Sequence, residues 1–179
     1  ALKTIVVPAG AKKLGLGIFS LCTSLTSATL PDNVDKMGNT VFWGCSALTQ
    51  VKLPQNLTEI PTGTFRDCKS LTRVDIPASV TKIGQGAFQG CGLTSVTFPA
   101  GLTEIESEAF ESCNRLTAVS IPGSAECKFM SFRNCKGLKK VTIGERYKST
   151  PYELNSIFMG CSFVNPRMTT TPACVTYQP

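Results

Sequence analysis

The chain has 179 residues, of which 42% are hydrophobic and 17% charged, and its formal net charge is +6. This composition is typical of a protein that buries a core, and it excludes the disordered and fibrous classes. The absence of histidine removes the commonest general base, the Ser/His and Cys/His catalytic pairs and every metal site that needs an imidazole. No apolar run approaches the roughly 20 residues of a membrane span, and the opening ALKTIVVPAG lacks the features of a signal peptide.

A repeat of cysteine and phenylalanine runs through the chain. Successive repeat cysteines are separated by 23, 23, 23, 22, 22 and 26 residues, and a phenylalanine stands three positions before each one. Most of them are followed by LTxVxIP or a close variant. Because a fixed period of this length is typical of solenoids, we interpret each copy as one coil. The cysteines are Cys22, Cys45, Cys68, Cys91, Cys113, Cys135 and Cys161, and the phenylalanines are Phe19, Phe42, Phe65, Phe88, Phe110, Phe132 and Phe158.

The first half of each coil predicts a strand and the second half a return. Within LTRVDIP, Val74 and Ile76 point inward while the residues that alternate with them point outward, as in a strand with one buried face. Pro77 ends this strand because it has no backbone N–H. The return SVTKIGQGAFQGC predicts a short extended segment followed by a single 3₁₀ or helical turn. Since one coil cannot bury its own apolar face, the coils must stack.

The pattern LTxVxIPxxVTxIGxxAFxxC resembles the BspA-like leucine-rich repeat, which occurs in surface proteins of anaerobic bacteria and some protozoan parasites. The resemblance covers residues 1 to about 164. It implies a β-rich α/β fold, a curved right-handed solenoid with a parallel sheet on one face and short extended segments and 3₁₀ or helical turns on the other. We expect a single domain over 1–179, with about seven coils of 22–26 residues and an irregular end at 162–179. The resemblance also implies an extracellular or cell-surface location and a role in adhesion or protein binding.

The later part of the chain departs from the repeat. Cys127 stands where earlier coils carry isoleucine, so we expect it in the core. The next coil, GERYKSTPYELNSIFMGC, is longer and is expected to bulge outward. Val175 and Tyr177 are expected to supply a last strand, whereas Cys174 has no predicted place.

The start of the chain already carries apolar residues at core positions, without a recognisable capping repeat. These are Leu2, Ile5 and Val7. A solenoid that starts this way exposes an apolar edge. We therefore expect the rest of a longer chain, or a partner, to cover the N-terminal edge.

The cysteine and phenylalanine columns are interpreted as core. None of the nine cysteines is closer than eight residues to another, which disfavours structural zinc, and stacked side chains point in parallel, which disfavours disulfides. Cysteine then serves as a small apolar residue. The phenylalanines predict rings stacked one over another. No metal, cofactor or catalytic group is expected, because Glu104, Glu106, Glu108 and Glu111 are interpreted as solvated charges.

Candidate residues for contact with a partner are those expected to be exposed on the surface or to form a charged patch. Trp43 is expected to point outward, as a contact residue or as a lone surface side chain. The outward face of the strands, which includes Arg73, is expected to be small, polar and flat. Basic residues gather late in the chain and predict an electropositive patch, with a merely solvated face as the alternative. The candidate binding residues are Trp43, Arg73, Lys128, Arg133, Lys136, Lys139, Lys140, Arg146 and Lys148.

These observations predict a non-enzymatic binding module that recognises its partner through a rigid solenoid surface. The expected partner is a protein or a sulfated glycan, for example a host matrix protein. Nucleic acid is not expected, because aromatic stacking residues and a known reading fold are both missing. The alternative is a structural spacer domain within a larger surface protein.

Overall fold

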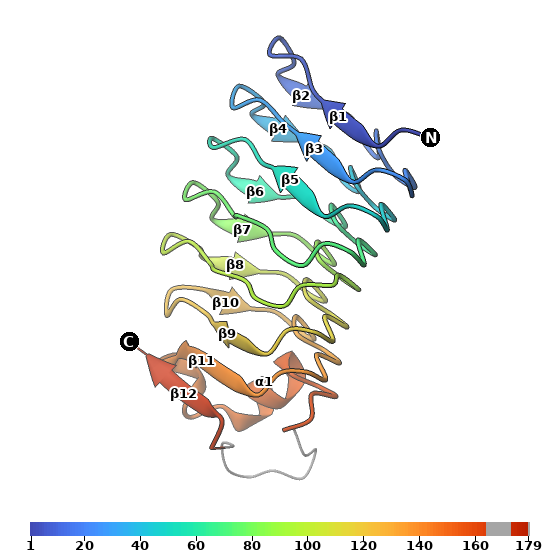
Figure 1. The fold of residues 1–179 in the computed structure, drawn as a ribbon. Helices are drawn as coiled ribbons and strands as arrows, with labels where there is room; N and C mark the ends of the chain where they lie inside the picture. Colours follow the sequence, from blue (N-terminus) through green and yellow to red (C-terminus); the bar gives the residue numbers. More distant parts are fainter. Residues whose placement is uncertain (164–172, 179) are drawn as a thin grey trace.

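Short parallel strands and tight turns alternate along a stack of coils that follow one another in chain order (Figure 1). The structure, a computed structural model, describes residues 1–163 and 173–178. Most coils begin with a strand in the LTxVxIP motif, turn at a proline, and return through a second, shorter strand and a series of turns. The expected leucine-rich-repeat solenoid is confirmed.

The LTxVxIP strands form one side of the solenoid, which we call the main strand face; it consists of segments 4–6, 27–29, 50–52, 73–75, 95–97, 118–120 and 140–142. Its strands pair in parallel and in register, so that the same motif position lies side by side in neighbouring coils. One sheet has the order β1-β3-β5 and the other β12-β11-β9. The strands are β1 (Thr4–Val6), β3 (Ser27–Thr29), β5 (Gln50–Lys52), β9 (Ala118–Ser120), β11 (Lys140–Gly144) and β12 (Val175–Gln178). The predicted last strand, β12, is confirmed.

The return strands form a second side, which we call the return face. They also pair in parallel, with the sheet orders β2-β4 and β10-β8-β7-β6. Cys127 pairs with Ile105 and is buried, so its predicted place in the isoleucine column is confirmed. The strands are β2 (Lys13–Leu14), β4 (Lys36–Met37), β6 (Glu59–Ile60), β7 (Lys82–Ile83), β8 (Glu104–Ile105) and β10 (Glu126–Cys127).

The AFxxC corners consist of single turns closed by hydrogen bonds between residues three apart, such as Cys68 N–H to Phe65 O at 3.0 Å, which agrees with the prediction of a single 3₁₀-type turn. Within the described residues, a 3₁₀ helix occurs at η1 (Glu145–Tyr147) and an α-helix at α1 (Pro151–Ile157), both in the long late coil. The first six corners do not continue into a helix, because two residues in each of them have positive φ, which interrupts a helical run. In the 48–70 coil these are Gly63 at 62° and Asp67 at 60°.

The core is one continuous cluster built on the phenylalanine and cysteine columns. Neighbouring rings of the phenylalanine column are stacked, with centroids 5.0 to 5.6 Å apart, so the predicted ring stack is confirmed. All nine cysteines are free thiols, and all but Cys22 and Cys174 are buried. Each buried column thiol donates a hydrogen bond to the phenylalanine carbonyl of the preceding coil, as Cys68 Sγ does to Phe42 O at 3.1 Å. Cysteine therefore contributes a donor as well as a small apolar group.

The long late coil covers the end of the return face. Tyr147, Leu154 and Ile157 are buried, so the insertion packs against the core with one side, and the expectation of an outward bulge is wrong. These apolar residues lie in η1 and α1, where helical spacing directs them to one side. The side chain of Tyr152, by contrast, is exposed.

Candidate functional site

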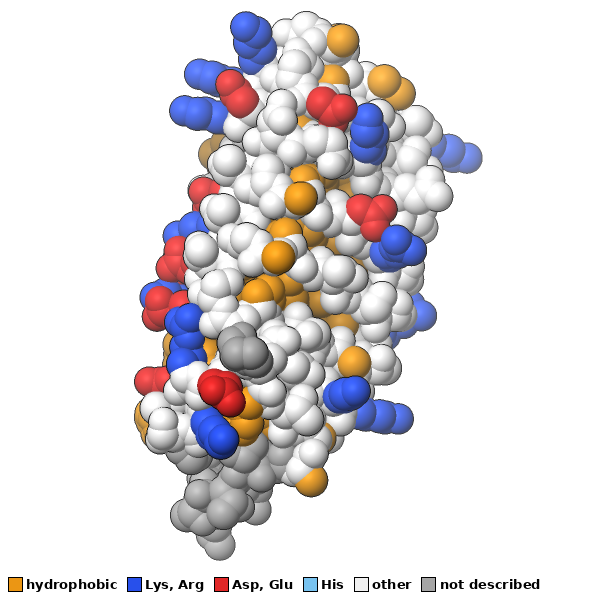
Figure 2. All heavy atoms as spheres, turned by 90° about the vertical axis from the view of Figure 1, so that its left-hand side faces the viewer, with side chains coloured by type: hydrophobic (Ala, Val, Ile, Leu, Met, Phe, Trp, Pro, Cys, Tyr) orange, Lys and Arg blue, Asp and Glu red, His pale blue; other side chains and the backbone are white. Residues whose placement is uncertain are grey.

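The middle of the main strand face is hollowed, which corrects the expectation of a flat surface. One hollow of about 520 Å³ lies between segments 73–78 and 95–100. A second, of about 440 Å³, lies between segments 27–29, 49–52 and 73–75. Both are lined by Arg73, so they adjoin, and together we call them the central groove. In Figure 2 apolar side chains are visible along the middle of the molecule, with charged side chains to either side.

The backbone ladder is open at the central groove. In the column that ends each strand, Leu30 N–H donates to Lys52 O at 3.0 Å and Ile121 N–H donates to Thr142 O at 2.8 Å. The N–H groups of Leu53, Ile76 and Phe98 occupy the same column but donate to no described residue. Segments 73–76 and 95–98 are accordingly not strands.

The floor of the central groove is apolar. Ile76 and Val96 pack against the core but are only half-buried, whereas Leu30 and Ile121, at the strand-end position that Ile76 holds, are fully buried. Phe98 stands at a position that other coils fill with aliphatic residues, and its ring packs edge-on against Phe110 at 5.5 Å. The opening of the ladder therefore gives access to core side chains.

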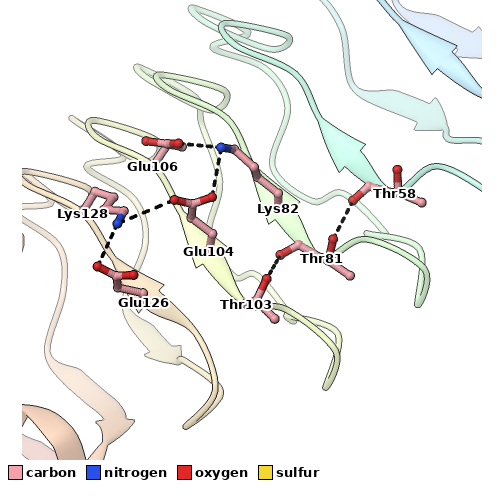
Figure 3. Close-up of polar contacts among 8 residues, drawn as sticks. All are labelled: Thr58, Thr81, Lys82, Thr103, Glu104, Glu106, Glu126 and Lys128. Atoms are coloured by element: carbon pink, nitrogen blue, oxygen red, sulfur yellow. Dashed lines mark hydrogen bonds and ion pairs between the residues drawn. The ribbon is translucent and has the colours of Figure 1, made fainter.

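A network of ion pairs lies on the return face (Figure 3). Lys82 Nζ lies 2.7 Å from Glu106 Oε1 and 2.9 Å from Glu104 Oε2. Lys128 Nζ lies 2.8 Å from Glu126 Oε1 and 3.7 Å from Glu104 Oε1. Glu104 thus joins two lysines from the coils on either side. The interpretation of the acidic cluster as solvated charges is wrong for Glu104, Glu106 and Glu111, each of which has an ion-pair partner.

The network shifts the pKa values of Lys82, Glu104 and Lys128 in the directions expected for ion pairs. Hydrogen bonds to Glu106 and Glu104 raise the pKa of Lys82 above its ordinary value of 10.5. The hydrogen bond from Lys82 lowers the pKa of Glu104 below its ordinary value of 4.5. The hydrogen bond to Glu126 raises the pKa of Lys128. Lys82, Glu104 and Lys128 are therefore charged near neutral pH, which suits a structural role rather than proton transfer.

A threonine ladder runs beside the network (Figure 3). Thr81 Oγ1 donates to Thr58 O at 3.3 Å, and Thr103 Oγ1 donates to Thr81 O at 3.0 Å. Each hydroxyl thus bonds the carbonyl of the preceding coil. The ladder and the ion pairs connect adjacent coils on this face.

The structure divides the candidate binding residues among three regions. On or beside the main strand face lie Arg73, which pairs with Asp75 at 3.0 Å, and three exposed lysines of the late coil. These lysines have no ion-pair partner among residues 1–163 and 173–178. They are Lys136, Lys139 and Lys140.

The second region is the end of the return face, where Lys128 and Arg146 line one hollow. Lys128 belongs to the ion-pair network, and Arg146 donates to the carbonyls of Gly123 and Ser124. Lys148 follows η1 and is exposed. The late basic residues therefore do not share one surface.

The third region is the row of AFxxC corners, where Trp43 and Arg133 lie. Trp43 points outward as predicted, with 38% of its surface exposed, and lines a hollow of about 320 Å³ together with Arg66. Arg133 lies 3.5 Å from Glu111, which also accepts a hydrogen bond from Gln89. Trp43 is thus separated from the exposed lysines of the main strand face.

Sequence reasoning missed the ion-pair network and the central groove. The network had a signal: Glu59, Lys82, Glu104 and Glu126 recur at one motif position, so their contact follows from the repeat. The groove had a weaker signal: Phe98 replaces an aliphatic residue of the repeat, whereas Ile76 and Val96 keep the pattern.

Two absences concern other kinds of site. Over the described part of the chain, no three His, Cys, Asp or Glu residues are grouped so that they could hold a metal ion. Among the same residues, no helix has the length and apolar character needed to cross a membrane.

Comparisons with known proteins identify the family. The BspA type leucine rich repeat region matches in six copies, over residues 1–117 and 103–173. No curated protein sequence matches significantly. Among solved structures, a leucine-rich repeat protein from Bacteroides ovatus is 30% identical, with a TM-score of 0.73 over 78% of this chain and 39% of that one. The leucine-rich repeat protein of T. pallidum is 26% identical, with a TM-score of 0.52 over 79% and 58% of the two chains.

A leucine rich cell surface protein from Faecalibacterium prausnitzii is 20% identical, with a TM-score of 0.60 over 99% of this chain and 60% of that one, and it shows the same fold. The chain therefore spans only part of the length of these three proteins, between 39% and 60%. Because the repeat match extends over residues 1–173, the protein belongs to the BspA type leucine-rich repeat family.

Proposed function

We propose that the chain is a non-enzymatic binding module that recognises a partner protein through its main strand face. The observation that supports this most is the central groove, which opens apolar core positions to solvent on an otherwise regular stack of coils. Exposed apolar surface within a polar surround is typical of interaction sites. The stacked phenylalanines make the scaffold rigid, so little conformational entropy is lost on binding.

An extracellular or cell-surface location is part of the proposal and is supported by the family. Adhesion to a host matrix protein or a sulfated glycan fits that location. Lys140 lies on the main strand face and Lys139 directly precedes it, and neither has an ion-pair partner among the described residues. They supply positive charge for an acidic partner surface.

The test is a binding screen of the purified chain against matrix proteins and sulfated glycans at about 0.05 and 0.3 M salt, a range over which exposed charge contacts weaken. We expect a partner whose affinity falls when Lys139 and Lys140 are both changed to Glu. The matched control changes Lys13 and Lys36 to Glu, because this in-register pair lies on the return face. Equal losses from both variants would indicate nonspecific charge attraction. Absence of any binding would favour the structural spacer instead.

A further inference from the structure

The central groove combines unpaired backbone donors with apolar side chains. Leu53, Ile76 and Phe98 present their N–H groups in one row without a described acceptor. The apolar groups of Ile76 and Val96 lie between the coils that carry these donors, partly open to solvent. A ligand suited to this groove must supply hydrogen-bond acceptors and apolar groups together.

An extended polypeptide has both features. Its carbonyl groups are regularly spaced acceptors, and its side chains alternate in direction. Extended peptides that join an open sheet obtain affinity from main-chain hydrogen bonds and specificity from pockets for alternate side chains. The two adjoining hollows, of about 520 and 440 Å³, provide such pockets.

The charges at the groove favour a peptide over a sulfated glycan. Arg73 and Asp75 stand at the rim of both hollows and pair with each other at 3.0 Å. Lys52, which lines the second hollow, lies 3.7 Å from Asp32, so its charge is also partnered. The other polar side chains of the rim are uncharged, namely Gln50 and several serines and threonines. A polyanion would find no excess positive charge here, whereas an apolar peptide needs none.

We propose that the central groove binds an extended peptide segment of the partner protein, with its carbonyls accepting from the unpaired N–H groups and its apolar side chains entering the hollows. This inference rests on the proposed protein-binding function and names the part of the partner that is recognised. It places the recognition site in the middle of the main strand face, apart from Lys139 and Lys140.

The experiment selects random peptides displayed on phage against the purified chain and then measures the affinity of the enriched synthetic peptides. The groove is blocked by changing Ala78 and Ala100, two exposed residues that line it, both to Trp. The matched control is Ala9→Trp, because Ala9 is exposed and follows Pro8 as Ala78 follows Pro77 in a later coil. We expect apolar peptides that bind the blocked variant about tenfold more weakly or worse, with no loss in the control.

A second measurement locates the bound peptide by amide hydrogen exchange. In the free chain, the N–H groups of Ile76 and Phe98 should exchange faster than that of Leu30, which is bonded to Lys52. Addition of an enriched peptide should slow exchange at Ile76 and Phe98 and leave Leu30 unchanged. Protection of Ile76 in the free chain equal to that of Leu30 would overturn the inference.

The two proposals can fail separately. The peptide inference is overturned if no peptide is enriched, or if the enriched peptides bind the blocked variant as well as the unchanged chain. The binding function survives that result if a matrix protein still binds the blocked variant. It fails, by contrast, if neither the peptides nor any protein or glycan of the panel binds.

Discussion

The backbone N–H of Cys127 donates a 2.8 Å hydrogen bond to the hydroxyl oxygen of Tyr147, which lies 20 residues later in the chain. Cys127 is in β10, the last described strand of the return face. In place of a further strand, the inserted 3₁₀ helix η1 supplies one buried phenolic oxygen. Tyr147 thus caps the sheet.

Removal of this cap should destabilise the protein. In Tyr147→Phe the buried N–H of Cys127 loses its acceptor, and we expect the free energy of unfolding to fall by about 1–3 kcal/mol. Urea denaturation measures the change. Tyr152→Phe is the control, since Tyr152 is 85% exposed. Equal stability of the two variants would contradict the capping role.

The ion-pair network should stabilise the fold only between two pH limits. The lowered pKa of Glu104 gives a contribution that is complete above pH 4.5, its ordinary pKa, and is lost as the pH falls. The raised pKa of Lys82 gives a contribution that is complete below pH 10.5 and is lost as the pH rises further. We expect Lys82→Met to cost less than about 1 kcal/mol at pH 7 and less still at either extreme.

Urea denaturation of the unchanged chain and of Lys82→Met at several pH values measures this pH dependence. Arg73→Met is the matched control, because the Arg73–Asp75 pair joins two strongly exposed side chains within one coil. A stability difference for Lys82→Met that did not change with pH would show that the side chain acts by packing alone.

The thiols should fall into two classes of reactivity. Burial raises the pKa of Cys45 to about 11 and that of Cys113 to about 12, so almost no thiolate is present near neutral pH. We expect a thiol reagent to label only Cys22 and Cys174 rapidly in the native protein, because they alone are not buried. Mass spectrometry identifies the sites. In denaturant all nine should react, and rapid native labelling at Cys68 would be inconsistent with the structure.

At corner positions with positive φ, glycine should give a more stable protein than serine. Ser112 and Gly90 occupy the same corner position in neighbouring coils, with φ of 60° and 69°. Because an ordinary residue is strained there, Ser112→Gly should raise the free energy of unfolding by about 0.5–1 kcal/mol. Gly90→Ser should lower it, since a Cβ would also meet Asp67 Oδ1 at 2.7 Å. A loss of stability in Ser112→Gly would refute the strain argument.

The repeat explains what was predictable from sequence. Side chains at one motif position occupy one column, so the burial of Phe88, the outward direction of Trp43 and the place of Cys127 followed from the pattern. The contacts of Glu104 with Lys82 and Lys128 were equally accessible, because the three residues lie in successive coils.

Two features depend on geometry that the pattern does not carry. The ladder is open at Ile76 although Ile76 and Ile121 are the same residue type at the same strand-end position and Ile121 N–H is bonded, so residue type does not predict the opening. The insertion at 145–157 breaks the repeat, and the burial of Tyr147 depends on where η1 directs its side chain. One sequence is enough to predict which side chains share a motif position. The open ladder and the packing of the inserted segment follow only from the three-dimensional structure.

The register that places the same motif position side by side in neighbouring coils also affects how repeats can be gained or lost in evolution. Ala28 pairs with Ile5 on one side and with Val51 on the other, so the first coils meet their neighbours through equivalent edges. Recombination between two copies of the repeat can then add or delete one whole coil and leave complementary edges behind. A partial coil would bring a main strand against a return strand. We therefore expect the length of such proteins to change in steps of one coil.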